Sequence, residues 1–171
     1  MKMTEATETN RPSWYPAETA QAMKAAPKNQ QWLADAAYFR FLERGRGGLD
    51  GTAAGDWAFA ERKMDIMIEE HFLRERLRQS DDPNEKIALA TIAFIATFQF
   101  LLPSEVVDDL RLGDLAFLEK GLGLGITCSA IGETAGVGEL PQPVGAGTVG
   151  ELIAALQASY AAKQRRTAKR K

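Results

Sequence analysis

Apolar residues recur at helical spacing over the first half of this chain. From residue 29 to residue 44 they return every three or four positions, which is the spacing of one helix face. A glycine-rich interruption at residues 45–48 ends this pattern, and a longer run of the same kind then extends to Ser80. Two such helices joined by a short turn are expected to pack antiparallel. A shorter helix between Pro16 and Pro27 is expected before them, because proline disfavours helix in the residue that precedes it.

The most apolar run of the chain lies between Lys86 and Pro103. Short polar side chains precede Pro83 and provide a helix-start signal. The run is 16 residues long, or about 24 Å as a helix, and two threonines and a glutamine interrupt it. A bilayer core requires roughly 20 apolar residues. The pattern therefore predicts a buried central helix from Pro83 to Leu102, and insertion of residues 87–102 into a membrane is the alternative.

The region after Pro103 changes character. Its apolar spacing predicts a helix over residues 104–122 that is kinked or split at Gly113. Residues 121–132, GLGLGITCSAIG, lack the spacing of a phosphate-binding loop, so they predict a close-packed helix or turn. A Gly/Pro-rich loop should follow. Thr148 and Glu151 then form a capping box for a last amphipathic helix.

Six or seven helices with no convincing strand pattern predict an all-α fold. We expect a helical bundle with an antiparallel helix pair at its N-terminal end and a Gly/Pro-rich loop before the last helix. The predicted organisation is a mobile tail at residues 1–15, an N-terminal helical domain at 16–80, an apolar helical segment with the Gly/Pro-rich loop at 81–162, and a basic tail at 163–171.

Charge is unevenly distributed along the chain. The net charge is −2, but residues 1–162 carry 15 basic and 23 acidic side chains, a net charge of −8. The last nine residues hold six of the 21 basic groups. Such a tail can attract nucleic acid or an anionic membrane, or it can fold back onto the acidic body. The candidate polyanion contacts are Lys163, Arg165, Arg166, Lys169, Arg170 and Lys171.

Signatures of catalysis and metal binding are weak. A single cysteine and a single histidine exclude an internal disulfide and make a Cys/His zinc site within one protomer improbable. Cys128 has apolar neighbours in the sequence and is expected to be a small buried hydrophobe. A bundle-type metal site needs glutamate three residues before His71, where this chain has isoleucine. Glu61, Asp65 and Glu69 share one helix face and predict a solvated acidic stripe. No catalytic residue, metal or cofactor is therefore predicted.

The turn between the first two long helices carries a distinctive set of residues. They follow an Ala-Tyr, Arg-Gly and Asp-Trp-x-x-Ala-Glu pattern, at Ala36, Ala37, Tyr38, Arg44, Gly45, Asp56, Trp57, Ala60 and Glu61. In this pattern, residues 32–61 resemble a short bacterial helix-turn-helix domain whose own function is unknown. The resemblance implies a fold for this part of the chain and no activity.

Two interpretations of these motif residues stay open. In the first, Tyr38 and Trp57 clamp the helices together, Asp56 caps the second helix, and Arg44 pairs with Glu61. In the second, the turn is a docking edge with arginines as its polar anchors. The candidate interaction residues are therefore Tyr38, Arg44, Arg46, Asp56, Trp57 and Glu61.

The absence of a catalytic set favours a non-enzymatic accessory or assembly subunit that binds another protein or complex. The apolar middle segment or the glycine-rich region is expected to be buried against that partner. A cytoplasmic location is expected, because the N-terminal sequence does not resemble a secretory signal. One alternative is a membrane-associated protein that uses residues 87–102 and the basic tail. Another is a protein that binds nucleic acid weakly and without sequence specificity.

Overall fold

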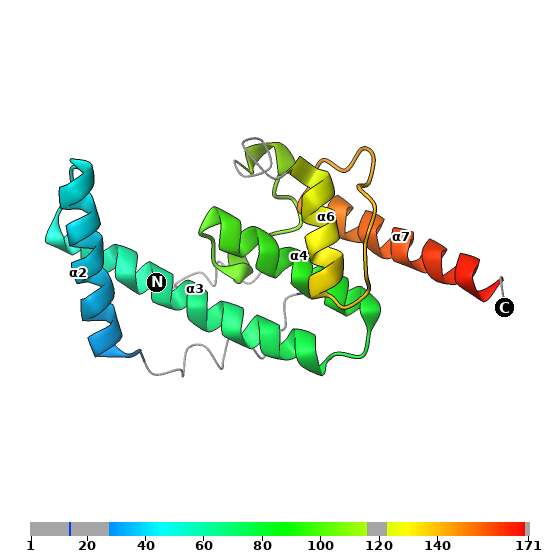
Figure 1. The fold of residues 1–171 in the computed structure, drawn as a ribbon, viewed down its shortest axis with the longest axis horizontal. Coiled ribbons are helices and arrows are strands. Elements are labelled where there is room, and N and C mark those ends of the chain that lie inside the picture. The colour runs from blue at the N-terminus through cyan, green and yellow to red at the C-terminus, as the bar shows by residue number, and fades with distance from the viewer. Residues whose placement is uncertain (1–13, 15–27, 116–122, 170–171) are drawn as a thin grey trace, which may run out of the picture.

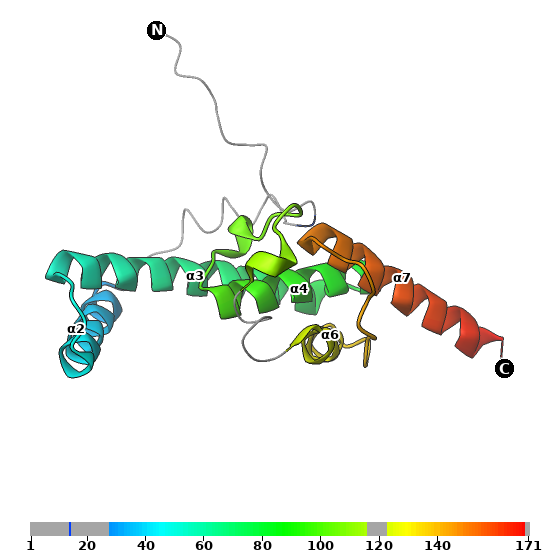
Figure 2. The ribbon, with the colours of Figure 1, turned by 90° about the horizontal axis from the view of Figure 1, so that it is seen from above.

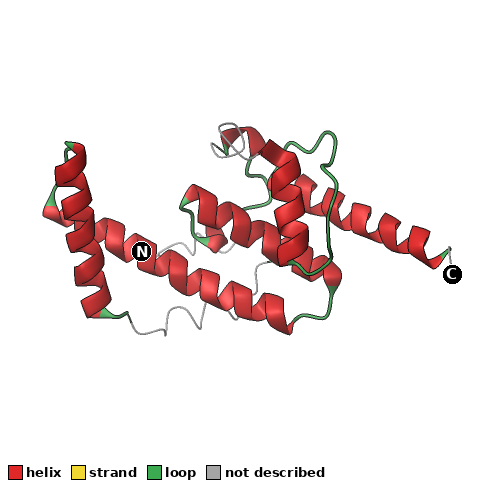
Figure 3. Ribbon diagram, viewed as in Figure 1, coloured by secondary structure: helices red, strands yellow, loops and turns green. Residues whose placement is uncertain are grey.

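The computed structural model describes residues 14, 28–115 and 123–169. Within these ranges the chain is helical without strands, which confirms the predicted all-α class (Figure 3). The α-helices in chain order are α2 (Gln30–Gly47), α3 (Ala53–Gln79), α4 (Pro83–Gln99), α6 (Gly123–Thr134) and α7 (Val149–Ala168). Two 3-10 turns, η1 (Pro103–Glu105) and η2 (Leu112–Asp114), lie between α4 and α6. The predicted helix between Pro16 and Pro27 falls outside the described residues, as does the predicted tail apart from Trp14.

Local capping interactions set the helix boundaries. The Asn29 side chain accepts a hydrogen bond from the backbone N–H of Trp32 at 3.0 Å and starts α2. Gly48 ends α2 with φ of 62°, a left-handed conformation that favours glycine. Asp82 caps α4 ahead of Pro83. The predicted capping box at the start of α7 is confirmed, because the Thr148 and Glu151 side chains bond each other's backbone.

Helix α4 is the centre of the main hydrophobic core. It packs against α3, α6 and α7, which surround it in Figures 1 and 2. Five consecutive residues from Ile87 to Thr91 are completely buried, and the Thr91 hydroxyl donates to the carbonyl of Ile87 at 2.8 Å. The prediction of a buried central helix is therefore confirmed. No helix in the described ranges is long and apolar enough to cross a membrane.

Helix α3 belongs to two hydrophobic clusters. Leu73, in its C-terminal half, is part of the main core around α4. Ala60 and Met64, nearer its N-terminus, form a second and smaller cluster with Leu33 of α2. The packing thus continues through residue 80, where the sequence predicted a domain boundary.

Helix α2 lies across the N-terminal half of α3, at one end of the molecule (Figures 1 and 2). The two helices cross steeply, so the predicted antiparallel arrangement is wrong. Small side chains at the contact, Ala36, Ala37 and Ala60, let the helices approach over a short stretch. Beyond that stretch α2 extends away from the main core.

The predicted helix over residues 104–122 is wrong in its described part. Between η1 and η2 the backbone instead forms a single antiparallel bridge, between Arg111 and Thr148. The N–H of Val149 donates to the carbonyl of Leu110 at 2.9 Å, and the N–H of Gly150 donates to that of Asp108 at 2.8 Å. These tertiary hydrogen bonds satisfy the first amides of α7 and hold the segment in a turn and a single bridge. Residues 116–122 lie outside the described ranges.

The acidic stripe on α3 is only partly solvated. Glu61 is exposed, and Asp65 forms an ion pair with Lys28 at 2.8 Å. Glu69, however, is 8% exposed and accepts hydrogen bonds from the backbone N–H and the hydroxyl of Ser104, both at 2.9 Å. The prediction of a solvated stripe is therefore wrong at Glu69, whose carboxylate positions the η1 turn.

The predicted helix or turn in the glycine-rich region is confirmed as α6. Cys128 of this helix is completely buried, as predicted, and its burial raises the pKa of the thiol to about 11. Gly132 of α6 contacts the following loop closely, because a Cβ at this position would lie 2.2 Å from the carbonyl oxygen of Gly138. The glycine-rich sequence therefore allows a loop to pack directly on a helix.

Candidate interaction surfaces

Arg44 is the centre of the corner between α2 and α3. Its Nε donates to Oδ1 of Asp56 at 3.0 Å, and its Nη2 donates to Oδ2 at 2.7 Å. Its Nη1 donates to the carbonyl of Gly51 at 3.0 Å. One guanidinium therefore joins the end of α2, the connecting loop and the first turns of α3, in the two-pronged geometry that suits arginine.

This arrangement corrects two of the predicted roles. Thr52 caps α3 by accepting a hydrogen bond from the N–H of Gly55 at 3.1 Å, whereas Asp56 lies one turn further and does not cap. Arg44 pairs with Asp56 and not with Glu61, which is exposed further along α3. The short loop brings the start of α3 against the end of α2, so the nearer carboxylate becomes the partner.

The ion pair explains the lowered pKa of Asp56 and the presence of glycine at position 51. Hydrogen bonds from Arg44 hold the pKa of Asp56 below its usual range, although the Asp56 side chain is removed from solvent. At Gly51, an added Cβ would lie 2.6 Å from Cδ of Arg44. A glycine at this loop position therefore leaves room for the arginine side chain.

The predicted aromatic clamp is wrong. Tyr38 is 58% exposed and Trp57 is 38% exposed. The contact between α2 and α3 is made by Leu33, Ala60 and Met64. Tyr38 lies five positions after Leu33, so its side chain is turned by about 140° from the buried face of the helix. Tyr38 consequently points away from α3.

Helix α2 carries a second apolar face, which we call the open face. It consists of Ala34, Tyr38, Phe41, Leu42 and Gly45. Phe39 lies outside this face, beside Tyr38, with ring centres 6.1 Å apart. Phe39 is 63% exposed and Phe41 is 52% exposed. The signal in the sequence was the presence of apolar residues on every side of this helix. An interpretation that assigns all apolar residues of the helix to one packed face does not predict the open face.

Other contacts anchor α2 to the rest of the molecule. The Arg40 guanidinium lies 4.6 Å from the centre of the Phe59 ring on α3. Phe59 in turn stacks on Phe100, which ends α4, with ring centres 5.1 Å apart. The open face is therefore presented by a helix that is held at several points.

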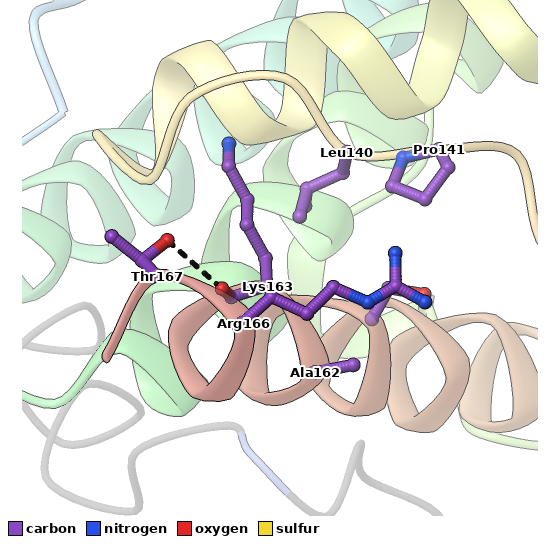
Figure 4. Close-up of a pocket in the computed structure, with 7 residues that line it drawn as sticks. Leu140, Pro141, Ala162, Lys163, Arg166 and Thr167 are labelled. Carbon is purple, nitrogen blue, oxygen red and sulfur yellow. Dashed lines mark hydrogen bonds between the residues drawn. The ribbon is translucent and has the colours of Figure 1, made fainter. Parts of the chain in front are cut away.

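The basic C-terminal segment is helical as far as Ala168, because α7 continues through it. Lys163 and Arg166 line a groove of about 580 Å³ between α7 and the loop that carries Leu140 and Pro141. In Figure 4, Lys163 extends toward this loop and Arg166 extends toward Pro141. Lys163 Nζ contacts the carbonyl of Glu139 at 3.4 Å. Arg165 is exposed on the same helix, and the exposed Lys169 is its C-cap residue, whereas Arg170 and Lys171 are outside the described residues.

No known protein family, curated protein or solved structure matches this chain. The resemblance of residues 32–61 to a short helix-turn-helix domain therefore stays a prediction. Function has to be argued from the surfaces themselves.

Many apolar residues of the segments expected to be buried against a partner are packed inside the chain instead. Ile87, Leu89 and Ile92 of α4 are completely buried in the main core, as are Cys128 and Ile131 of α6. These buried residues are therefore not available to a partner, and the partner-binding role of the two segments stays a prediction. Among the described residues no group of side chains could hold a metal ion. The open face of α2 and the basic groove beside α7 are the candidate surfaces that follow from the packing.

Proposed function

We propose that this chain is a non-enzymatic, cytoplasmic assembly subunit that binds another protein through the open face of α2. The observation that carries the proposal is the exposure of two aromatic side chains on this face, Tyr38 and Phe41, each more than half exposed, with the exposed Phe39 ring 6.1 Å from that of Tyr38. Tyrosine and phenylalanine are enriched at the centres of protein interfaces, where they bury a large area with few rotatable bonds. Such a group on one helix favours a docking surface over scattered surface hydrophobes.

The anchoring of α2 supports this proposal. The hydrogen bonds of Arg44 to Asp56 and Gly51 hold the C-terminal end of the helix. The small cluster around Leu33 holds its N-terminal half. A surface that is already ordered loses little conformational entropy on binding. Arg46, an exposed cation beside the open face, provides a polar contact at its rim.

The proposal is tested by photo-crosslinking in the native host. A benzophenone amino acid replaces Tyr38 in the full chain, and the crosslinked products are identified by mass spectrometry. The matched control carries the same amino acid in place of Ala158, which is exposed on α7. We expect a discrete crosslinked product at residue 38 that is absent from the control. Identical patterns at the two positions would contradict a docking role for α2.

Polyanion binding at α7 is a second candidate, and the groove lined by Lys163 and Arg166 favours it. Cations on a helix attract phosphate groups and release counterions, without selecting a base sequence. Binding to two unrelated DNA duplexes should be weak, equal, and strongly reduced by added salt. Tight binding of one duplex alone would contradict this candidate. A double change of Lys163→Gln and Arg166→Gln that leaves the affinity unchanged would also contradict it.

A further inference from the structure

We infer that the partner of the open face is a second copy of this chain, with the two α2 helices packed antiparallel around a two-fold axis. This inference rests on the proposed function and names its partner. Its first support is the order of residues along the open face: Ala34, Tyr38, Phe41 and Gly45, at spacings of four, three and four. The order is small, aromatic, aromatic, small in both directions. A symmetric dimer requires a self-complementary surface of this kind.

The antiparallel arrangement matches side chains by size. Ala34 of one copy lies opposite Gly45 of the other, so the helix backbones can approach closely at both ends of the contact. Tyr38 lies opposite Phe41 of the other copy, and the rings pair near the two-fold axis. Spacings of four and three keep these positions on one seam between two helices.

Charge supports the same arrangement. Asp35 and Arg46 are eleven residues apart, or about three helical turns, so they lie on the same flank of the open face. Both side chains are exposed, and Asp35 accepts a hydrogen bond from the Gln31 amide at 2.9 Å. In an antiparallel pair, each Asp35 comes beside Arg46 of the second copy. A parallel two-fold pair would place this flank on opposite sides of the seam in the two copies, so Asp35 and Arg46 would not meet across it.

The position of α2 leaves room for a second copy. The helix is the outermost element at one end of the molecule, and the main core lies away from it (Figures 1 and 2). Aromatic residues of about 200 Å², each roughly half exposed, contribute on the order of 100 Å² each to a contact. Tyr38 and Phe41 would therefore bury about 400 Å² over two copies, and their smaller neighbours add to this, which places the contact toward the lower limit of specific interfaces. The expected dimer is therefore dependent on concentration, with dissociation in the micromolar range.

The first test measures mass against concentration for the full chain. Sedimentation velocity from about 1 to about 200 µM should show a shift from monomer to dimer. Phe41→Glu should remain monomeric throughout while its circular dichroism spectrum is unchanged. The matched control is Ile126→Glu on α6, where the isoleucine is 60% exposed, and this variant should dimerise like the original chain. A monomer at every concentration would overturn the inference, as would a dimer that Phe41→Glu does not weaken.

The second test determines the orientation of the helices. Asp35→Arg and Arg46→Asp should each weaken dimerisation by about threefold to tenfold, and the double variant should restore it, because opposite charges again face each other. A mixture of Asp35→Cys chains and Arg46→Cys chains should form a mixed disulfide under mild oxidation. Failure of both the charge rescue and the mixed disulfide would overturn the antiparallel arrangement.

The outcomes separate this inference from the proposed function. If the chain is monomeric and residue 38 crosslinks to a different protein, the open face is still a docking surface, but its partner is not a second copy of this chain. A monomeric chain with no specific capture at residue 38 overturns both.

Discussion

Gly132→Ala should destabilise this protein even though alanine normally favours a helix. Gly132 lies near the C-terminal end of α6, where the following loop folds back over it. An added Cβ would lie 2.2 Å from the Gly138 carbonyl oxygen, about 0.8 Å short of the 3.0 Å that such contacts require. It would also lie 3.0 Å from Cγ of Leu140, whose side chain is 2% exposed.

The loop has little freedom to move away. Gly138 has φ of 74°, a left-handed conformation, and the N–H of Val137 donates to the carbonyl of Gly132 at 3.0 Å. Overpacking of a close contact costs about 1 to 3 kcal/mol, and a clash with backbone belongs at the upper end of that range. The higher helix propensity of alanine offsets about 0.5 to 1 kcal/mol. A net loss of about 1 to 2.5 kcal/mol lowers the melting midpoint of a chain of this size by roughly 2 to 10 °C.

Thermal and urea unfolding, followed by circular dichroism, measure this effect. Gly55→Ala is the matched control, because its Cβ would meet only Oγ1 of Thr52, at an ordinary 3.5 Å. That variant should gain about 0.5 to 1 kcal/mol from helix propensity alone. A Gly132→Ala chain that melts at or above the original midpoint would refute the packing of this loop on α6.

Four further outcomes are expected. The Cys128 thiol, whose pKa burial raises to about 11, should react with a thiol reagent near pH 8 only after denaturant is added; rapid labelling of the native chain would contradict its burial. Trp57→Ala should cost about 1 kcal/mol or less in urea unfolding, since the ring is 38% exposed, and a loss of about 3 kcal/mol or more would reinstate the aromatic clamp. The pKa of Asp56 is held below its usual 3.8, so the folded chain binds fewer protons at this site than the unfolded chain. The stability from this pair is complete above that value and is lost as the pH falls below it; an Asp56→Asn variant should lose less stability than the original chain in melting scans between about pH 5 and pH 2. Removal of residues 163–171 should leave the melting midpoint nearly unchanged, because the described side chains of this segment are exposed, and failure of the truncated chain to fold would contradict this.

Local signals in the sequence predicted the start of those helices whose capping residues lie next to them in the chain. Pro83 follows a capping aspartate, and Thr148 with Glu151 forms a complete capping box. These interactions involve residues within three positions of each other, so they form independently of the rest of the chain. The burial of α4 was equally predictable, because an apolar run too short for a bilayer still has to avoid water.

Long-range contacts decided what the local pattern could not. Residues 104–115 have helical spacing, yet the first amides of α7 and the carboxylate of Glu69 hold parts of this segment in other conformations. The choice of Asp56 as the partner of Arg44 depended on the path of the connecting loop.

The candidate surface shows the same division. From its sequence, α2 is a helix with apolar residues on several sides, and periodicity alone does not say which side is packed. That choice was made by Ala60 and Met64 of α3, which accept Leu33 and leave Tyr38 and Phe41 exposed. The sequence by itself determined the all-helical class, the capped helix ends and the buried central helix, because these depend on neighbouring residues and on hydrophobicity. Only the tertiary structure decided which aromatic side chains face solvent, because exposure depends on where a distant helix packs.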